Sequence, residues 1–80
     1  MKDIKVLGGG CRNCRRLEEH IRVALDTLGM EATITKVTDM NEIADYGVFA
    51  TPAMVVDGEV KVSGRVATPE EVQALLTAGV

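Results

Sequence analysis

The sequence predicts an α/β fold with the element order β-α-β-α-β-β-α, in which helices cover both faces of a mixed four-stranded sheet. Three observations lead to this prediction: a short β-branched strand followed by apolar residues at helical spacing, an Asp57-Gly58 hairpin turn, and a capping-box motif starting at Thr68. Because 80 residues suffice for one small core, we expect residues 1–80 to form a single domain.

The first predicted strand is Ile4–Leu7, and three consecutive glycines, residues 8–10, end it with a flexible turn. From Cys14 onward, apolar residues recur at the spacing of one helix face, and Gly29 marks the helix end. These residues are Leu17, Ile21, Ala24, Leu25 and Leu28.

A second strand is predicted over residues 32–37, where threonines alternate with apolar residues. The Asp39 side chain, with Glu42 three residues later, is typical of the start of a helix, and Gly47 ends this short helix. A parallel strand pair joined by the first helix is therefore expected.

The third and fourth strands are predicted to form a hairpin, because Asp57-Gly58 suits a tight turn with positive φ and lies between the apolar run 53–56 and the pair Val60 and Val62. A last helix starts at Thr68, with Pro69 at its first position and Glu71 completing a capping box, and it ends near Gly79.

Composition limits the classes of partner and the location. The chain has 46% hydrophobic residues and a net charge of −3, and its basic cluster, arginines 12, 15, 16 and 22, is interrupted by Glu18 and Glu19. We therefore expect no nucleic-acid partner. No segment approaches the ~20 apolar residues of a membrane helix, and no secretory signal is evident, so we expect no membrane partner and a cytoplasmic protein.

The two cysteines, Cys11 and Cys14, lie three residues apart at a helix start, where a disulfide between them is possible. Cys14 falls in the apolar stripe, whereas Cys11 lies at its margin and nearer solvent. The helix N-terminus, Arg15 and, more weakly, Arg12 should lower the pKa of Cys11. We therefore predict that Cys11 is the nucleophile of thiol-disulfide exchange and Cys14 the resolving cysteine.

Two other classes of function stay open at this point. Cys-x-x-Cys after a strand also suits a soft-metal module that binds copper or zinc, although His20 lies outside the stripe and tetrahedral zinc needs four ligands. A redox-sensing adaptor is the third possibility. The exchange hypothesis requires no metal, and no cofactor beyond a redox-active Cys11–Cys14 disulfide.

Three segments together resemble the thioredoxin superfamily, especially its minimal, glutaredoxin-like members. They are the strand and glycine turn leading to Cys11-Arg12-Asn13-Cys14, the segment 46–53 with Thr51-Pro52, and the Asp57-Gly58 hairpin closed by Gly64. The resemblance implies a thioredoxin-like fold and activity on protein disulfides or dithiols. It also implies an electron donor such as a flavin-dependent, thioredoxin-reductase-like enzyme or a dedicated partner protein.

The same resemblance implies that the Thr51-Pro52 bond is cis and that both residues bind substrate, the Thr51 backbone pairing with an extended segment. Two positions depart from the family pattern: Gly9-Gly10 replaces an aromatic residue, and Arg12-Asn13 lacks the usual proline or tyrosine. No glutathione site is inferred.

Other residues have simpler interpretations. Arginines 12, 15 and 16 form either a solvated helix face or a surface for an acidic partner. Phe49 is either buried or part of an apolar rim beside Pro52. Tyr46 and the methionines at 30, 40 and 54 are predicted to pack in the core or at its boundary. His20 is predicted to be an exposed or boundary residue of the helix.

Overall fold

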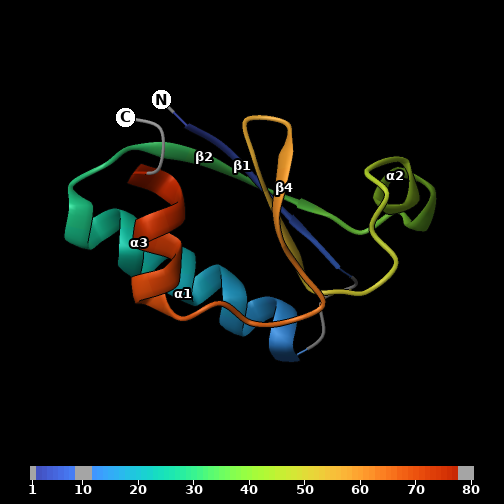
Figure 1. Cartoon of the computed structure of the whole chain (residues 1–80), viewed down its shortest axis with the longest axis horizontal. Helices are drawn as coiled ribbons and strands as arrows, with labels where there is room; N and C mark the ends of the chain where they lie inside the picture. Colours follow the sequence, from blue (N-terminus) through green and yellow to red (C-terminus); the bar gives the residue numbers. More distant parts are fainter. Residues whose placement is uncertain (1, 9–11, 78–80) are drawn as a thin grey trace.

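A computed structural model describes residues 2–8 and 12–77 (Figure 1). The predicted order of strands and helices is confirmed. The elements are β1 (Lys2–Leu7), α1 (Arg12–Leu28), β2 (Ala32–Val37), α2 (Met40–Asp45), β3 (Ala53–Val56), β4 (Glu59–Ser63) and α3 (Pro69–Thr77). The predicted end of the last helix near Gly79 lies outside the described residues.

The four strands form one mixed sheet in the order β2-β1-β3-β4. β1 and β2 are parallel and in register from Lys2 opposite Ala32 to Leu7 opposite Val37. β3 runs antiparallel to both β1 and β4. The parallel pair requires a crossover, which α1 supplies, and the two antiparallel pairs place β1 and β3 at the centre of the sheet.

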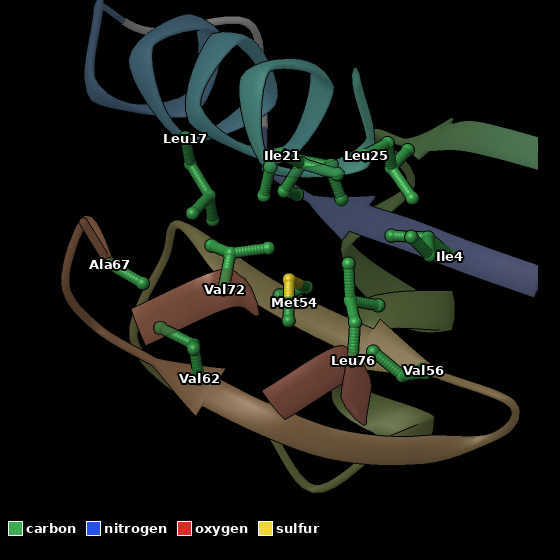
Figure 2. Packing of buried hydrophobic residues seen from close by; sticks show 12 residues of the cluster. Ile4, Leu17, Ile21, Leu25, Met54, Val56, Val62, Ala67, Val72 and Leu76 are labelled. Carbon is green, nitrogen blue, oxygen red and sulfur yellow. The ribbon is translucent and has the colours of Figure 1, made fainter. Parts of the chain in front are cut away.

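The main core lies between the sheet and the pair α1 and α3, which pack side by side on one face (Figure 1). Figure 2 shows the apolar stripe of α1 pointing toward strand residues, with α3 residues closing the space beside them. The buried residues of the main core are Ile4, Val6, Leu17, Ile21, Ala24, Leu25, Met54, Val56, Val62, Ala67, Val72 and Leu76. The α1 residues recur every three or four positions, so burial follows the predicted helical stripe.

The opposite face of the sheet has a smaller core beneath α2, so helices cover both faces as predicted. Its buried residues are Leu7, Val37, Ile43, Val48, Ala53 and Val55, with Tyr46 packed against them. α2 lies apart from α1 and α3, beyond the carboxyl end of β2 (Figure 1). The alternation of β3 side chains explains both cores, because Met54 and Val56 face one layer and Ala53 and Val55 face the other.

Two helices start as their capping residues predict. The Asp39 carboxylate accepts hydrogen bonds from the backbone N–H groups of Asn41 (2.8 Å) and Glu42 (3.4 Å). At α3, the Thr68 hydroxyl accepts from the Glu71 N–H at 3.1 Å while the Glu71 carboxylate accepts from the Thr68 N–H at 3.4 Å. These contacts satisfy N–H groups that have no partner inside the helix.

The hairpin between β3 and β4 has the predicted turn, with φ of 49° at Asp57 and 86° at Gly58. The β4 strand contains a bulge: Val55 pairs with Val60 and Met54 pairs with Val62, so Lys61 is the extra residue. As a result Val62, not Lys61, lies opposite Met54 and faces the main core.

Two predictions about side chains needed correction or a decision. Met40 is 72% exposed, so the prediction that it lies in the core or at its boundary was wrong. It is the first residue of α2 and is exposed to solvent. Phe49 is 92% exposed, which decides between the two alternatives for this residue in favour of exposure. Across residues 2–8 and 12–77, the structure contains no helix with the length and apolar character to cross a bilayer.

Candidate functional site

The two predicted cysteines differ in what the structure describes. Cys11, the predicted nucleophile, lies outside the described residues. Cys14 belongs to the first turns of α1 and is 5% exposed, as its place in the apolar stripe predicts. Its burial follows from the i, i+3 and i, i+7 spacing to Leu17 and Ile21, which both contact the sheet.

Gly8 brings three separate segments of the chain together. Its N–H donates to the Val37 carbonyl at 2.9 Å, which extends the parallel pairing of β1 and β2 by one residue. A Cβ at this position would overlap the Cys14 Sγ and would lie 3.5 Å from the Cys14 Cβ and 3.6 Å from the Thr51 Cβ. The end of β1, the start of α1 and the loop before β3 therefore meet at a residue that has no room for a side chain.

The Thr51–Pro52 peptide bond is cis, the geometry that the family resemblance implies. Thr51 is exposed and Pro52 is buried. The Pro52 carbonyl accepts a hydrogen bond from the Gly64 N–H at 2.9 Å, which ties this loop to the end of β4. Gly64 has φ of 76°, and a Cβ there would approach the Ala50 Cβ to 3.0 Å, so a glycine suits both the turn and the contact.

The arginines predicted to tune the thiol lie on α1. Arg12 and Arg15 are exposed, so their charges act through solvent and are partly screened. Arg15 also lines a small cavity of about 30 Å³ together with Cys14. The structure thus brings Arg15, Cys14 and, through Gly8, Thr51 into one region of the molecule.

The cavity beside Cys14 is also lined by two charged residues, Glu18 and Lys36, that the sequence did not indicate as part of the site. Its lining is Val6, Gly8, Cys14, Arg15, Glu18, Lys36 and Thr38. Glu18 follows Cys14 by four residues, so the helical spacing alone would place it on the same face. Lys36 comes from β2, and no sequence pattern indicates its approach to α1.

The Glu18 side chain is only 14% exposed and pairs with two cations. The Lys36 Nζ lies 3.0 Å from Oε1, and the Arg22 Nη2 lies 3.0 Å from Oε2. The hydrogen bond from Lys36, followed by that from Arg22, lowers the pKa of the Glu18 carboxyl despite its burial. Glu18 therefore stays ionised behind Cys14 at neutral pH.

Two of the remaining ring side chains, His20 and Tyr46, have structural contacts. The His20 Nδ1 lies 2.8 Å from the Ala67 carbonyl oxygen, which links α1 to the segment before α3 and agrees with the predicted boundary position. Tyr46 packs in the smaller core, and the Lys5 Nζ lies 6.0 Å from its ring centroid. Phe49 precedes Thr51 by two residues in the sequence and is exposed.

Within the described part of the chain, which excludes Cys11, no three His, Cys, Asp or Glu side chains are grouped to hold a metal ion.

Comparisons with known proteins agree with one another. A family model described as a thioredoxin domain matches residues 2–77. The chain is 42% identical over 77 residues to a thioredoxin of Methanothermobacter thermautotrophicus, covering 96% of this chain and 100% of that protein. It is 39% identical over 70 residues to a thioredoxin of Methanocaldococcus jannaschii, covering 88% of this chain and 80% of that protein.

A solved structure of thioredoxin-2, described as a component of the malaria parasite protein secretion machinery, is similar in fold. The TM-score is 0.69 at 14% sequence identity, with 95% of this chain and 81% of that chain covered. At this identity the likeness concerns the arrangement of strands and helices alone.

Proposed function

Since the chain belongs to the thioredoxin-domain family, a family of thiol-disulfide oxidoreductases that act on protein disulfides, we propose that it exchanges disulfides with partner proteins through Cys11 and Cys14. The observation that supports this most directly is the close approach of Gly8 to both Cys14 and Thr51, which a Cβ added to Gly8 would contact. It puts the sulfur of the predicted resolving cysteine beside the loop that we propose binds the substrate.

The proposed reaction has two balanced steps. The Cys11 thiolate attacks one sulfur of the partner disulfide, so that a Cys11–partner disulfide forms and the other partner sulfur leaves as a thiolate. Cys14 then transfers its proton to water and attacks the Cys11 sulfur, which forms the Cys11–Cys14 disulfide and releases the second partner thiolate. Two electrons pass from the dithiol to the partner, and a reductase or dedicated donor protein returns them.

Each predicted site residue has a part in this proposal. The backbone of Thr51, next to Pro52, pairs with an extended substrate segment. Arg12 and Arg15 stabilise the Cys11 thiolate with their positive charges, which lowers its pKa. Cys14 is buried, so a partner disulfide reaches it less readily, and Cys14 acts once the mixed disulfide has formed. No resident cofactor or metal is required, and the cytoplasmic location stays a prediction from the sequence.

Insulin reduction with dithiothreitol as electron source tests the proposal. The unmodified protein should accelerate the reaction, and both Cys11→Ser and Cys14→Ser should abolish the acceleration. Thr27→Ser, at the far end of the same helix, is the matched control and should retain it.

Trapping separates the two roles. Cys14→Ser should accumulate a mixed disulfide with insulin that mass spectrometry assigns to Cys11, whereas Cys11→Ser should accumulate none. Failure of Cys14→Ser to trap insulin would contradict the assigned roles. Stoichiometric copper or zinc in the purified protein, without any exchange, would favour the soft-metal module instead.

A further inference from the structure

The basic residues of this chain fall into two groups. Of the nine lysines and arginines in the sequence, six make ion pairs in the structure. These six are Lys2, Lys5, Arg22, Lys36, Lys61 and Arg65. The other three are Arg12, Arg15 and Arg16, and no ion pair involves them among residues 2–8 and 12–77, which contain all twelve Asp and Glu residues.

These three arginines gather at one place, the beginning of α1, and all are exposed. Together with Glu19 they line a shallow hollow on the surface, and the first turn of α1 contains no acidic residue. We call Arg12, Arg15 and Arg16 the basic patch. Outside the basic patch the chain has six basic and twelve acidic residues, so the rest of the chain has a formal charge of −6.

Folding does not account for the basic patch. The amino-terminal end of a helix has a partial positive charge, so each cation placed there is unfavourable. The other end of α1, where cations would be favourable, has no basic residue in its last turn. Three mutually repelling charges at the unfavourable end need a reason outside the stability of the helix.

The patch also lies where a partner must approach. Arg12 follows Cys11 directly in the sequence, and Arg15 follows Cys14 and lines its cavity. A protein whose disulfide reaches these cysteines brings its neighbouring residues within several ångströms of the guanidinium groups. Charges at this separation interact within one Debye length, which is about 8 Å at physiological ionic strength.

We propose that the basic patch docks an acidic segment of the partner protein, so that the preferred substrates are proteins whose disulfide is flanked by Asp or Glu. The inference rests on the proposed exchange function and adds the class of substrate to it. Planar guanidinium groups pair with carboxylates through two parallel hydrogen bonds, which suits three closely spaced arginines on a helix surface. The acidic remainder of the molecule would repel the same partner elsewhere and so restrict its orientation.

Exchange rates with synthetic peptides test the proposal. Three peptides share one internal disulfide and differ only in the flanking residues, which are glutamate, glutamine or lysine. The rate of each with dithiothreitol gives its intrinsic reactivity, and the protein's rate is divided by this value. We expect the glutamate peptide to react about 10-fold faster than the glutamine peptide at low salt, the lower end of electrostatic steering. The advantage should largely disappear at an ionic strength of about 0.5 M.

Variants locate the effect on the surface. Arg16→Glu should reduce the glutamate-to-glutamine rate ratio several-fold, and Glu19→Gln, which removes the carboxylate of the hollow, should increase it. Lys2→Glu changes the net charge as much as Arg16→Glu does. Lys2 starts β1, and the basic patch follows the other end of this strand, roughly 20 Å along the chain by the rise of a strand. Lys2→Glu should leave the ratio nearly unchanged.

Several outcomes would overturn the inference while leaving the exchange function intact. They are equal normalised rates for the three peptides, a preference for the lysine peptide, or equal effects of Arg16→Glu and Lys2→Glu. Stronger inhibition by a single-stranded DNA oligonucleotide than by a disulfide-free glutamate peptide would assign the patch to nucleic acid instead. Absence of exchange with all three peptides would reject the proposed function itself.

Discussion

Gly8→Ala tests the meeting of β1, α1 and the Thr51 loop. The added Cβ would overlap the Cys14 Sγ, whereas its next nearest neighbours, at 3.5 and 3.6 Å, are ordinary contacts. Gly8 is buried, so the new methyl group cannot escape into solvent. Overpacking of a tight site costs roughly 1–3 kcal/mol. Gly8 also has φ of 156°, which an alanine rarely adopts, so a backbone cost adds to the overpacking. At about 2 kcal/mol, the melting temperature of a domain this size should fall by roughly 8–16 °C.

A double-mutant cycle isolates the predicted contact. Unfolding in urea, with dithiothreitol present throughout, gives the free energy of unfolding of Gly8→Ala, Cys14→Ala and the double variant. Because Cys14→Ala removes the overlapping sulfur, the double variant should be more stable than the sum of the single effects by about 1 kcal/mol or more. Gly29→Ala, at φ 63° with no atom nearby, measures the backbone cost of an alanine at positive φ without any overlap. Additivity of the two substitutions within about 0.5 kcal/mol would refute the reasoning.

Three further predictions concern the ion pair behind the site, the core and a helix cap. The Lys36 ammonium lowers the pKa of the Glu18 carboxyl. The ion pair therefore stabilises the folded protein fully above the ordinary glutamate pKa of about 4.3, and this stabilisation is lost as the pH falls through the lower pKa of Glu18 in the folded state. Glu18→Gln should therefore lower the free energy of unfolding by about 1 kcal/mol at pH 7 and by less at pH values below about 4, and a pH-independent difference would contradict this. Leu76→Ala, at a fully buried position, should cost about 2–4 kcal/mol in urea unfolding, whereas Val23→Ala, at a half-exposed position, should cost much less; equal costs would contradict the assigned core. Thr68→Ala removes the cap of α3 and should lower the melting temperature by an amount equivalent to about 1 kcal/mol, while Thr68→Asp should retain most of the stability; an unchanged melting temperature in Thr68→Ala would show that the cap is dispensable.

Local chemistry explains why most of the fold could be predicted. Asp57-Gly58, the Thr68 capping box and the apolar stripe ending at Gly29 each depend on residues within a few positions of one another. Sequence spacing expresses such contacts directly. Burial of Cys14 was predictable for the same reason, because its spacing to Leu17 fixes which face of α1 it occupies.

Contacts between distant segments were not predictable in this way. Gly8 was interpreted as part of a flexible turn, although its approach to Cys14 and Thr51 joins three elements. The Lys36 to Glu18 pair likewise joins β2 to α1, and the alternating pattern of a strand does not show which helix lies beside it. The prediction that Met40 lies in the core or at its boundary failed for a related reason. Hydrophobicity alone does not say whether other elements cover the first turn of a short helix.

The bulge in β4 limits how the length of the hairpin can change. Successive strand residues point to opposite faces of the sheet. Deleting Lys61 would therefore restore regular pairing and leave Val62 opposite Met54. Inserting one residue between Gly58 and Val60 would instead move charged side chains toward the apolar layer. Insertions in this loop should therefore be accepted in pairs, which preserve the alternation, and rejected singly. In a library of loop variants, foldable members would separate by the parity of the inserted length.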